Sequence, residues 1–315
     1  MPTEKLSFIV TEELSGKRLD QALSQLCPQH SRARLQGWIK QGFVQLDNVR
    51  RRPRDPVSTG QKIEIDAELP EPLTFAAENI SLDVIYEDEE VLVINKPAGL
   101  VVHPGAGNPD HTLLNALLYY LPQLKHVARA GIVHRLDKDT SGLMVVALTP
   151  ETHSYLVEQL RQHLVKRQYQ AIVQGVMTAG GSIDAAISRH HIHRKRMAVK
   201  ASGKFALTHY RILKKYPAHT HIQVQLETGR THQIRVHMAH LKYPIVGDKV
   251  YGGRARVAKQ NSPQLREFIS AFPRQALHAS ELSLCHPVSN ALLEFSAAPP
   301  EDFNSLVSAL DNDES

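Results

Sequence analysis

The chain has only two cysteines among its 315 residues and contains no long apolar run. Cys27 and Cys285 each lack the close partner typical of a zinc site or a disulfide framework. No stretch reaches the ~18 uninterrupted apolar residues of a membrane helix, and the first ten residues carry Glu4 and Lys5 where a signal peptide would be apolar. We therefore expect a cytoplasmic protein with no membrane partner.

The chain also lacks the sequence motifs that bind nucleotides or zinc. The glycine-containing segment 102–109 matches neither a Walker loop nor a complete Gly-x-Gly-x-x-Gly pattern. His237 and His240 lack the acidic residue of the helical zinc motif, and the histidines between residues 190 and 193 stand among arginines, where contact with phosphate or solvent is more usual. We expect no cofactor and no metal, and keep a metal-dependent hydrolase as a minority alternative.

Basic residues are concentrated in two segments although the net charge is only +5. Residues 31–54 contain seven basic residues against the single acid Asp47, and residues 189–204 contain six with no acid. Patches of this density neutralise several phosphates, which favours nucleic-acid binding over two merely solvated faces. The candidate RNA-binding residues are Arg32, Arg34, Lys40, Arg50, Arg51, Arg52 and Arg54 in the first segment, Arg189, Arg194, Lys195 and Arg196 in the second, and Arg135 between them.

A polar loop at residues 134–142 stands between two apolar segments that are typical of buried strands. Loops held by rigid strands are common positions for catalytic residues. Asp137 is the candidate carboxylate, although an ion pair with Arg135 that only stabilises the loop fits the local sequence equally well. Arg230 lies at a predicted strand-to-helix junction, where its guanidinium can point into a shared cleft. Together they suggest a nucleophile or base with its orienting cation, without naming a reaction.

The order of the expected elements favours an α+β fold. Pro70 and Pro72 interrupt residues 67–79, which form the best linker in the chain. Beyond it, strands outnumber helices, which predicts a mixed, mostly antiparallel central sheet with flanking helices. The expected organisation is a small α+β domain at 1–72, a linker at 73–83, a main domain at 84–305 and an acidic tail at 306–315.

The first domain resembles the S4 RNA-binding domain. The matching features are Gly16-Lys17-Arg18-Leu19-Asp20, Ser31-Arg32 and a predicted helix that ends before Gly42. The resemblance implies that a short helix pair and its basic surface bind structured RNA. An ion pair between Arg18 and Asp20 that only stabilises the start of a helix explains those two residues equally well.

Residues 84–299 resemble the RluA-type pseudouridine synthases. Three motifs in the family's order carry the resemblance: His134-Arg135-Leu136-Asp137 with Thr140-Ser141-Gly142, residues 166–171 around Tyr169, and residues 228–237, followed by 244–248. Segments 101–110 and 130–133 are similar to the subgroup that modifies the large ribosomal subunit, although His111 stands where that subgroup usually has glycine.

The resemblance implies a pseudouridine synthase fold that isomerises uridines in a stem-loop of large-subunit (23S) rRNA without a cofactor or metal. Asp137 would be the catalytic carboxylate, attacking the ribose carbon or the base or abstracting a ribose proton, and Arg230 would be its ion-pair partner. Tyr169 would stack on the flipped uracil, although strand aromatics are usually ordinary core residues. Ile245 or Val246 would form the apolar wall beneath the base.

The expected partner is ribosomal RNA, free or within an assembling subunit, and the protein is expected to be a monomer. The alternative function is a non-catalytic RNA-binding ribosome assembly factor. Its effect in the cell would survive replacement of Asp137 by alanine.

Overall fold

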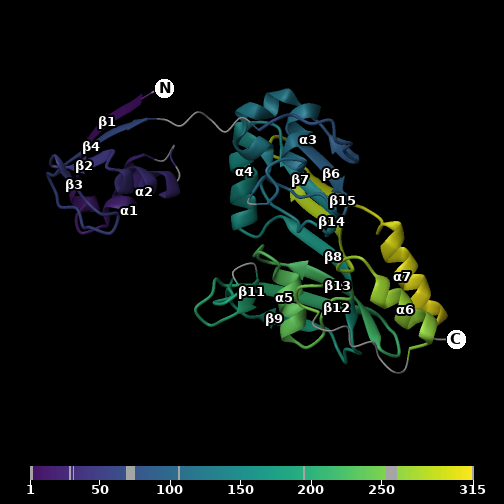
Figure 1. The fold of residues 1–315 in the computed structure, drawn as a ribbon. Helices are drawn as coiled ribbons and strands as arrows, with labels where there is room; N and C mark the ends of the chain where they lie inside the picture. The colour runs from purple at the N-terminus through teal and green to yellow at the C-terminus, as the bar shows by residue number, and fades with distance from the viewer. Residues whose placement is uncertain are drawn as a thin grey trace. The chain divides into compact units, whose positions relative to one another are not determined.

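The computed structural model describes residues 3–27, 30, 32–68, 75–105, 107–193, 196–252 and 261–313. They form two compact units, residues 1–74 and 75–315 (Figure 1). Each unit has a hydrophobic core of its own. Within the described ranges, no helix has both the length and the apolar character needed to cross a bilayer.

The first unit packs two helices against a four-stranded antiparallel sheet in the order β1-β4-β2-β3. Asp47 and Asn48, with φ angles of 51° and 60°, form the two-residue turn between β2 and β3, a conformation that Asp and Asn tolerate well. The only tryptophan of the chain, Trp38, is buried in this core. The elements are β1 (Thr3–Ile9), η1 (Glu12–Leu14), α1 (Leu19–Leu26), α2 (Arg32–Gln41), β2 (Val44–Leu46), β3 (Val49–Arg50) and β4 (Lys62–Glu68).

The second unit is built on a nine-stranded sheet in the order β5-β6-β7-β14-β8-β13-β12-β9, with β15 paired to β14. Only β14 and β7 pair in parallel among the described strands of this sheet, which confirms the predicted mixed, mostly antiparallel arrangement. Its strands are β5 (Val84–Glu87), β6 (Val91–Lys96), β7 (Ser141–Ala147), β8 (Lys166–Gln174), β9 (Gly181–Asp184), β12 (Leu207–Lys215), β13 (His219–Leu226), β14 (Leu277–Cys285) and β15 (Leu292–Ser296).

Helices flank this sheet, and a separate two-stranded hairpin accompanies it. Figure 1 shows α6 and α7 side by side, and their apolar residues, such as Ile269 and Leu306, belong to the main core. The remaining elements are α3 (Leu113–Tyr120), η2 (Pro122–His126), η3 (Ala128–Gly131), α4 (Pro150–Arg161), β10 (Ile187–Arg189), β11 (Met197–Val199), α5 (Gln233–His240), α6 (Pro263–Ala271) and α7 (Glu301–Asn312).

Two of the expected domain limits are wrong. Phe75 and Leu82, in the expected linker 73–83, pack against the main core, and the Asn115 side chain donates a hydrogen bond to the carbonyl of Ala76. Residues 73 and 74 lie outside the described ranges. The expected acidic tail, 306–315, is not separate from the main domain: it belongs to α7, which is helical to residue 312, and Leu306 is buried in the same core.

Strand β14 lies at the centre of the sheet, between β7 and β8, and approaches the start of β7 very closely. Gly142 has a φ of +116°, and a Cβ atom at this position would lie 2.2 Å from the carbonyl oxygen of Ala279 on β14. Only glycine fits both constraints. This contact fixes the end of the 134–142 loop against the middle of the sheet.

Candidate active site

The loop that carries Asp137 is held from β6 by a buried lysine. Lys96 is 1% exposed, and its ammonium donates hydrogen bonds to three backbone carbonyls, including that of Lys138 at 3.1 Å. Burial lowers the pKa of Lys96 to about 7, against the opposing influence of the Asp139 and Asp137 carboxylates. The loop backbone is therefore fixed by an interior group.

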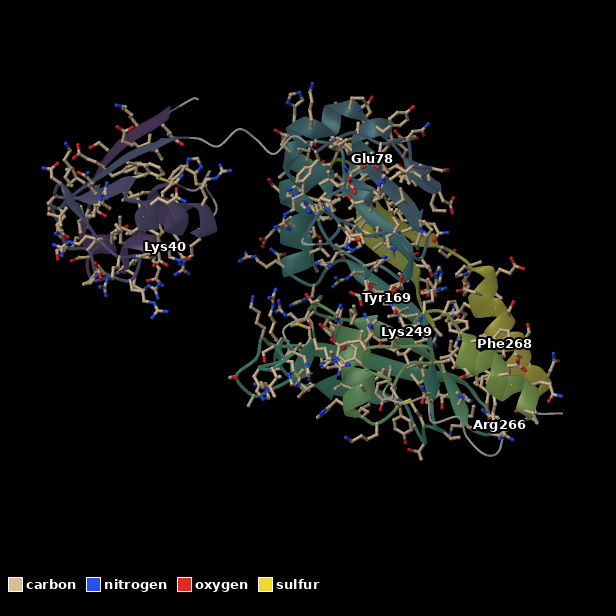
Figure 2. All side chains as sticks on the ribbon, viewed as in Figure 1. Lys40, Glu78, Tyr169, Lys249, Arg266 and Phe268 are labelled. Carbon is tan, nitrogen blue, oxygen red and sulfur yellow. The ribbon has the colours of Figure 1, made fainter. Side chains whose placement is uncertain are left out.

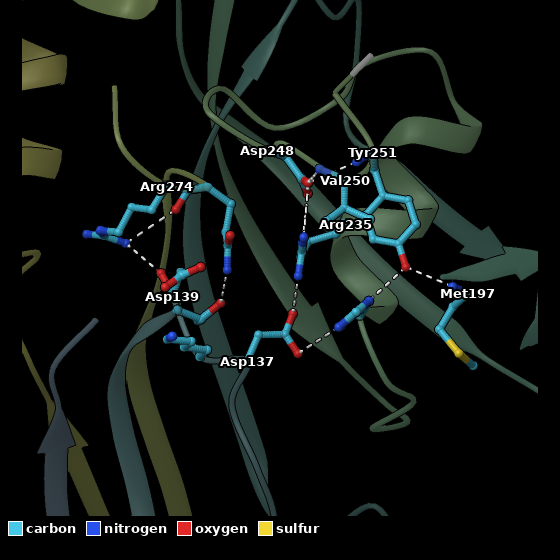
Figure 3. A network of polar contacts seen from close by, with 12 residues as sticks. Asp137, Asp139, Met197, Arg235, Asp248, Val250, Tyr251 and Arg274 are labelled. Carbon is cyan, nitrogen blue, oxygen red and sulfur yellow. Dashed lines mark hydrogen bonds and ion pairs between the residues drawn. The ribbon is translucent and has the colours of Figure 1, made fainter. Parts of the chain in front are cut away.

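Arg274, just before β14, holds the same loop at Asp139 (Figure 3). Its Nη1 donates to the Asp139 carbonyl at 3.1 Å, while Nε and Nη2 bind the two Asp302 oxygens at 2.6 and 2.7 Å. The Gln275 side chain adds a hydrogen bond of 3.1 Å to the Thr140 hydroxyl. Side chains from the start of β14 thus set the position of a loop more than a hundred residues earlier in the chain.

The Asp137 carboxylate forms an ion pair with Arg235, on the first turn of α5 (Figure 3). Arg235 Nη1 donates to Asp137 Oδ2 at 2.9 Å, and its Nε and Nη2 bind both oxygens of Asp248 at 2.7 and 3.0 Å. Burial raises the pKa of Asp248, but the Arg235 guanidinium and two backbone amides together lower it by more than burial raises it, so the net shift is downward. Asp248 therefore stays ionised and orients Arg235 toward Asp137.

Arg230 is not the ion-pair partner of Asp137, and this part of the prediction is wrong. Its Nε donates to the carbonyl of Phe205 at 2.9 Å, and its backbone amide donates to the Gln233 side chain. Arg230 belongs to the turn before α5, whereas Arg235 projects from the helix itself and is 6% exposed. Arg230 still lines the same cavity as Asp137.

His232 approaches the second oxygen of Asp137. Its Nε2 lies 3.7 Å from Oδ1, and its Nδ1 lies 2.7 Å from the hydroxyl of Tyr251. That hydroxyl accepts a hydrogen bond of 2.9 Å from the backbone amide of Met197 on β11, and the Arg235 guanidinium lies 5.1 Å from the Tyr251 ring centre (Figure 3). Burial lowers the pKa of His232, so the neutral imidazole is favoured. If the Tyr251 hydroxyl donates its hydrogen bond to Nδ1, the proton of the neutral ring is on Nε2, which faces Asp137.

Asp137 and Tyr169 line one small cavity, as the motifs predict. Tyr169 lies inside the second unit on β8 (Figure 2) and is 5% exposed. Burial raises the pKa of its hydroxyl, so the ring stays neutral. The lining residues are Arg135, Leu136, Asp137, Thr140, Tyr169, Leu226, Arg230, His232, Gln233, Ile234, Arg235 and Leu277.

Ile245 and Val246 are not among the residues that line this cavity, and their predicted role in the base pocket is wrong. Both are buried in the main core, where Ile245 bridges to Val173 and the amide of Val246 donates to Ile172 at 2.9 Å. The apolar lining of the cavity consists instead of Leu136, Leu226, Ile234 and Leu277.

The basic residues of the first unit lie on its surface. Lys40 projects from α2 (Figure 2), and Arg34 and the cluster at residues 50–54 include exposed arginines. Arg32 is also exposed, but it binds the buried carboxylate of Asp20 at 2.9 Å. The exposed members of the first predicted set are Arg32, Arg34, Lys40, Arg50, Arg51, Arg52 and Arg54.

In the second unit, Arg189 and Arg196 are exposed at the β10–β11 hairpin, and Arg135 is exposed at the cavity. Arg194 and Lys195 lie outside the described residues. In the described ranges, no group of three or more His, Cys, Asp or Glu residues is placed to hold a metal ion.

Sequence reasoning missed the roles of Lys96, Arg235, Asp248 and His232. Arg235 lies two positions after Gln233, within the motif that supplied Arg230. Its signal was helical position: Arg235 lies on the first turn of α5 and its guanidinium binds Asp137, whereas Arg230 lies before the helix and its guanidinium binds the carbonyl of Phe205. Nothing in the sequence around Lys96, Asp137 and Asp248 predicts that they act at one site, because these residues are brought together only when the sheet folds.

Comparison with known proteins gives the same assignment for both units. Residues 90–240 match the family model for RNA pseudouridylate synthase, and residues 17–63 match that for the S4 domain. Ribosomal large subunit pseudouridine synthase D of Pseudomonas aeruginosa is 55% identical over 301 residues, covering 96% of this chain and 94% of its own. The enzyme of that name from Haemophilus influenzae is 50% identical over 314 residues, covering 99% and 97%.

Two solved structures share the fold at lower identity. Human RNA Pseudouridylate Synthase Domain Containing 4 has a TM-score of 0.58 and 27% identity, covering 73% of this chain and 93% of that protein. Human RNA Pseudouridylate Synthase Domain Containing 1 has a TM-score of 0.57 and 25% identity, covering 75% and 90%. The fold and the family expected from the motifs are both confirmed.

Proposed function

The chain belongs to the RNA pseudouridylate synthase family, and from this premise we propose that it converts specific uridines in a stem-loop of large-subunit (23S) rRNA to pseudouridine. The N1 glycosidic bond breaks and the uracil turns. C5 is then joined to the same ribose carbon, and the proton on C5 is released. The observation that supports this site is the placement of Asp137: its Oδ2 accepts a hydrogen bond from Arg235, and the residue lines the same cavity as Tyr169.

In this proposal Asp137 is the catalytic carboxylate. Arg235, held by Asp248, fixes the orientation of the carboxylate. Asp137 then attacks the ribose carbon or the base, or takes a ribose proton, and each route requires that ionised oxygen. Arg230, which lines the cavity, is proposed to contact the RNA there in place of the ion-pair role that the sequence suggested.

The uridine reaches Asp137 by flipping out of the RNA. Flipping costs a few kcal/mol and least at an unpaired base, which favours a loop as the target. Tyr169 offers an aromatic face with a polar end for the extruded uracil, and Leu226 and Leu277 provide apolar contacts beside it. Arg135, exposed at the cavity, is positioned to contact the nucleotides that the uracil leaves behind.

The S4-like unit is proposed to dock the rRNA through its exposed arginines, and the protein is proposed to act as a monomer on free RNA or on an assembling subunit. Deletion of residues 1–72 should weaken RNA affinity and flatten its salt dependence. Equal affinity and salt dependence with and without these residues would contradict the docking role.

The test of the activity uses ribosomal RNA that carries tritium at uridine C5. The wild-type protein should release tritium, and Asp137→Asn should lower the rate by at least about a thousandfold, because the amide can neither attack nor take a proton. Asp110→Asn, at an exposed loop carboxylate, is the matched control and should keep full activity. No release by the wild type would contradict the substrate class, and full release by Asp137→Asn would contradict the catalytic role.

A further inference from the structure

Arg167, the second residue of β8, is a buried cation with no role in the scheme above. The residue is 7% exposed, and its Nε is shielded from solvent without a hydrogen-bond partner. No carboxylate in the described ranges forms an ion pair with it. Two other buried arginines, Arg235 and Arg274, each place two nitrogens on an aspartate. Arg167 is therefore unlike them, and an unpaired buried charge destabilises the free protein.

Arg167 lies beside the catalytic cavity. Arg167 and Tyr169 are two positions apart on one strand, so their side chains share a face of the sheet. Burial raises the pKa of Tyr169, and the Arg167 charge opposes this by lowering it. Burial is the main cause of the lowered pKa of His134, and the Arg167 charge lowers it as well. The guanidinium thus acts on residues of two of the three sequence motifs.

An open space faces one end of this guanidinium. A Cβ atom built on Gly229 would lie 3.0 Å from Arg167 Nη1 and would meet no other atom within 4 Å. Gly229 immediately precedes Arg230, which lines the cavity together with His232. Gly229 is exposed and has no side chain that would cover Nη1, so a ligand can approach this end of the guanidinium past the glycine.

We infer that Arg167 binds a phosphodiester group of the RNA backbone next to the uridine that enters the cavity. The inference rests on the proposed function, because it requires an RNA ligand. Only an anion cancels the charge of a guanidinium, and phosphates are the anions that RNA supplies. Arginine binds phosphate oxygens through short, charge-assisted hydrogen bonds. The free protein holds an unpaired charge, and RNA binding removes that penalty.

The stability of the free protein distinguishes a ligand-binding role from a structural one. Arg167→Met replaces the unpaired charge by an apolar chain of similar length, so calorimetry of the full chain should show a melting temperature raised by about 2 °C or more. Arg161→Met, at an exposed ion pair with Glu158 on α4, is the matched control and should change it little. A melting temperature lowered by Arg167→Met would show that the arginine supports the fold and would overturn the inference.

The RNA side of the contact is tested with neutral methylphosphonates. A stem-loop that the wild-type protein modifies in the tritium assay is synthesised with one methylphosphonate at a time around the target uridine. One position should weaken wild-type binding by about tenfold, and the same substitution should leave the affinity of Arg167→Met unchanged. An equal loss for both proteins at every position would overturn the inference. It would leave the proposed function intact, because that depends on tritium release alone.

Gly229→Ala provides an independent variant with the arginine still present. Its methyl group would occupy the space in front of Nη1, so it should weaken RNA binding and abolish the penalty at the same phosphate position. The melting temperature should not rise, since the unpaired charge remains. Unchanged RNA affinity in Gly229→Ala would contradict the location of the phosphate.

Discussion

Each unit contains an aspartate that binds arginine, and the two aspartates differ in how completely their oxygens are used. In the first unit, Asp20 is 0% exposed and accepts hydrogen bonds from Arg18 on both oxygens, from Arg32 at 2.9 Å and from Gln36 at 2.5 Å. In the second unit, Asp137 has a side chain that is 15% exposed and receives one hydrogen bond, from Arg235 to Oδ2.

This difference separates a structural carboxylate from one that is available for chemistry. Asp20 is fully buried and both of its oxygens accept hydrogen bonds from fixed side chains, so a substrate has no access to it. Among the residues that the structure describes, none donates a hydrogen bond to Oδ1 of Asp137, and His232 Nε2 lies 3.7 Å from it. The same pair of residue types therefore stabilises the fold in one unit and, in the proposed function, orients the reacting carboxylate in the other.

Replacement of Arg235 should have the largest effect. Arg235→Gln leaves the buried Asp248 carboxylate without its cation, so the free energy of unfolding of the second unit should fall by about 3 kcal/mol. Tritium release should fall by about a hundredfold, because Asp137 also loses its partner. Urea denaturation and single-turnover assays measure the two effects. Arg161→Gln is the surface control, and equal behaviour of the two variants would refute the role assigned to Arg235.

Replacement of Asp20 should affect stability but not chemistry. Asp20→Asn removes the charge that binds Arg18 and Arg32, both of which can regain water, so the first unit should lose about 2 kcal/mol. Trp38 reports this unit specifically, because it is the only tryptophan and is buried there. Single-turnover tritium release at saturating enzyme should stay within about twofold of wild type. A large loss of turnover at saturation would contradict the contrast between the two aspartates.

Acid should reveal the same contribution of Asp20 without a mutation. Its pKa is lowered from 3.8 to about 2, since hydrogen bonds from Gln36, Arg18 and Arg32 outweigh the opposing effect of burial. The unfolded chain takes up the proton first, so the stabilisation is present above about pH 4 and is lost as the pH falls toward about 2. The urea midpoint followed by Trp38 fluorescence should fall over that window. Asp20→Asn should show a weaker pH dependence, and an equal one would rule out Asp20 as its source.

Removal of the Tyr251 hydroxyl should have the smallest effect. Tyr251→Phe keeps the ring beside Arg235 but frees His232 Nδ1, so His232 no longer has a fixed tautomer beside Asp137. We expect the single-turnover rate to fall by about fivefold with unchanged RNA affinity. Tyr120→Phe, which removes an exposed hydroxyl bonded to Glu87, is the control. A change in affinity alone would assign Tyr251 to RNA binding instead.

The sequence predicted the elements of the fold better than their limits. The mixed, mostly antiparallel sheet and the strand after the 134–142 loop, β7, were predicted correctly, because apolar runs depend on local periodicity. The apolar segment before this loop is not a strand, and Ile132 forms an isolated bridge to Val146. The predicted limits of the linker and the tail were wrong for a non-local reason. Phe75 and Leu306 belong to short apolar segments, and whether these are buried depends on the distant residues of the core that cover them.

In the site, the motifs predicted Asp137 and Tyr169 but assigned the cation to the wrong arginine. Arg230 and Arg235 occur in one motif, and only the start of α5 decides which guanidinium reaches Asp137. The roles of Lys96 and Arg274 could not be predicted, since both act through backbone carbonyls of a distant loop. The predicted role of Ile245 in the base pocket was wrong because an apolar residue near a motif can be buried equally well in the core or in a pocket.

The central position of β14 sets the order in which the second unit can form. This strand, residues 277–285, joins the β5–β6–β7 half of the sheet to the half that begins with β8. A nascent chain that has not reached Leu277 therefore holds two half-sheets with unpaired edges, which are prone to association with other chains. Synthesis must be nearly finished before β7 and β8 gain their shared neighbour. We expect the newly made protein to depend on protection of these edges until its last strands emerge, and a chain truncated after residue 276 to lose cooperative unfolding of this unit.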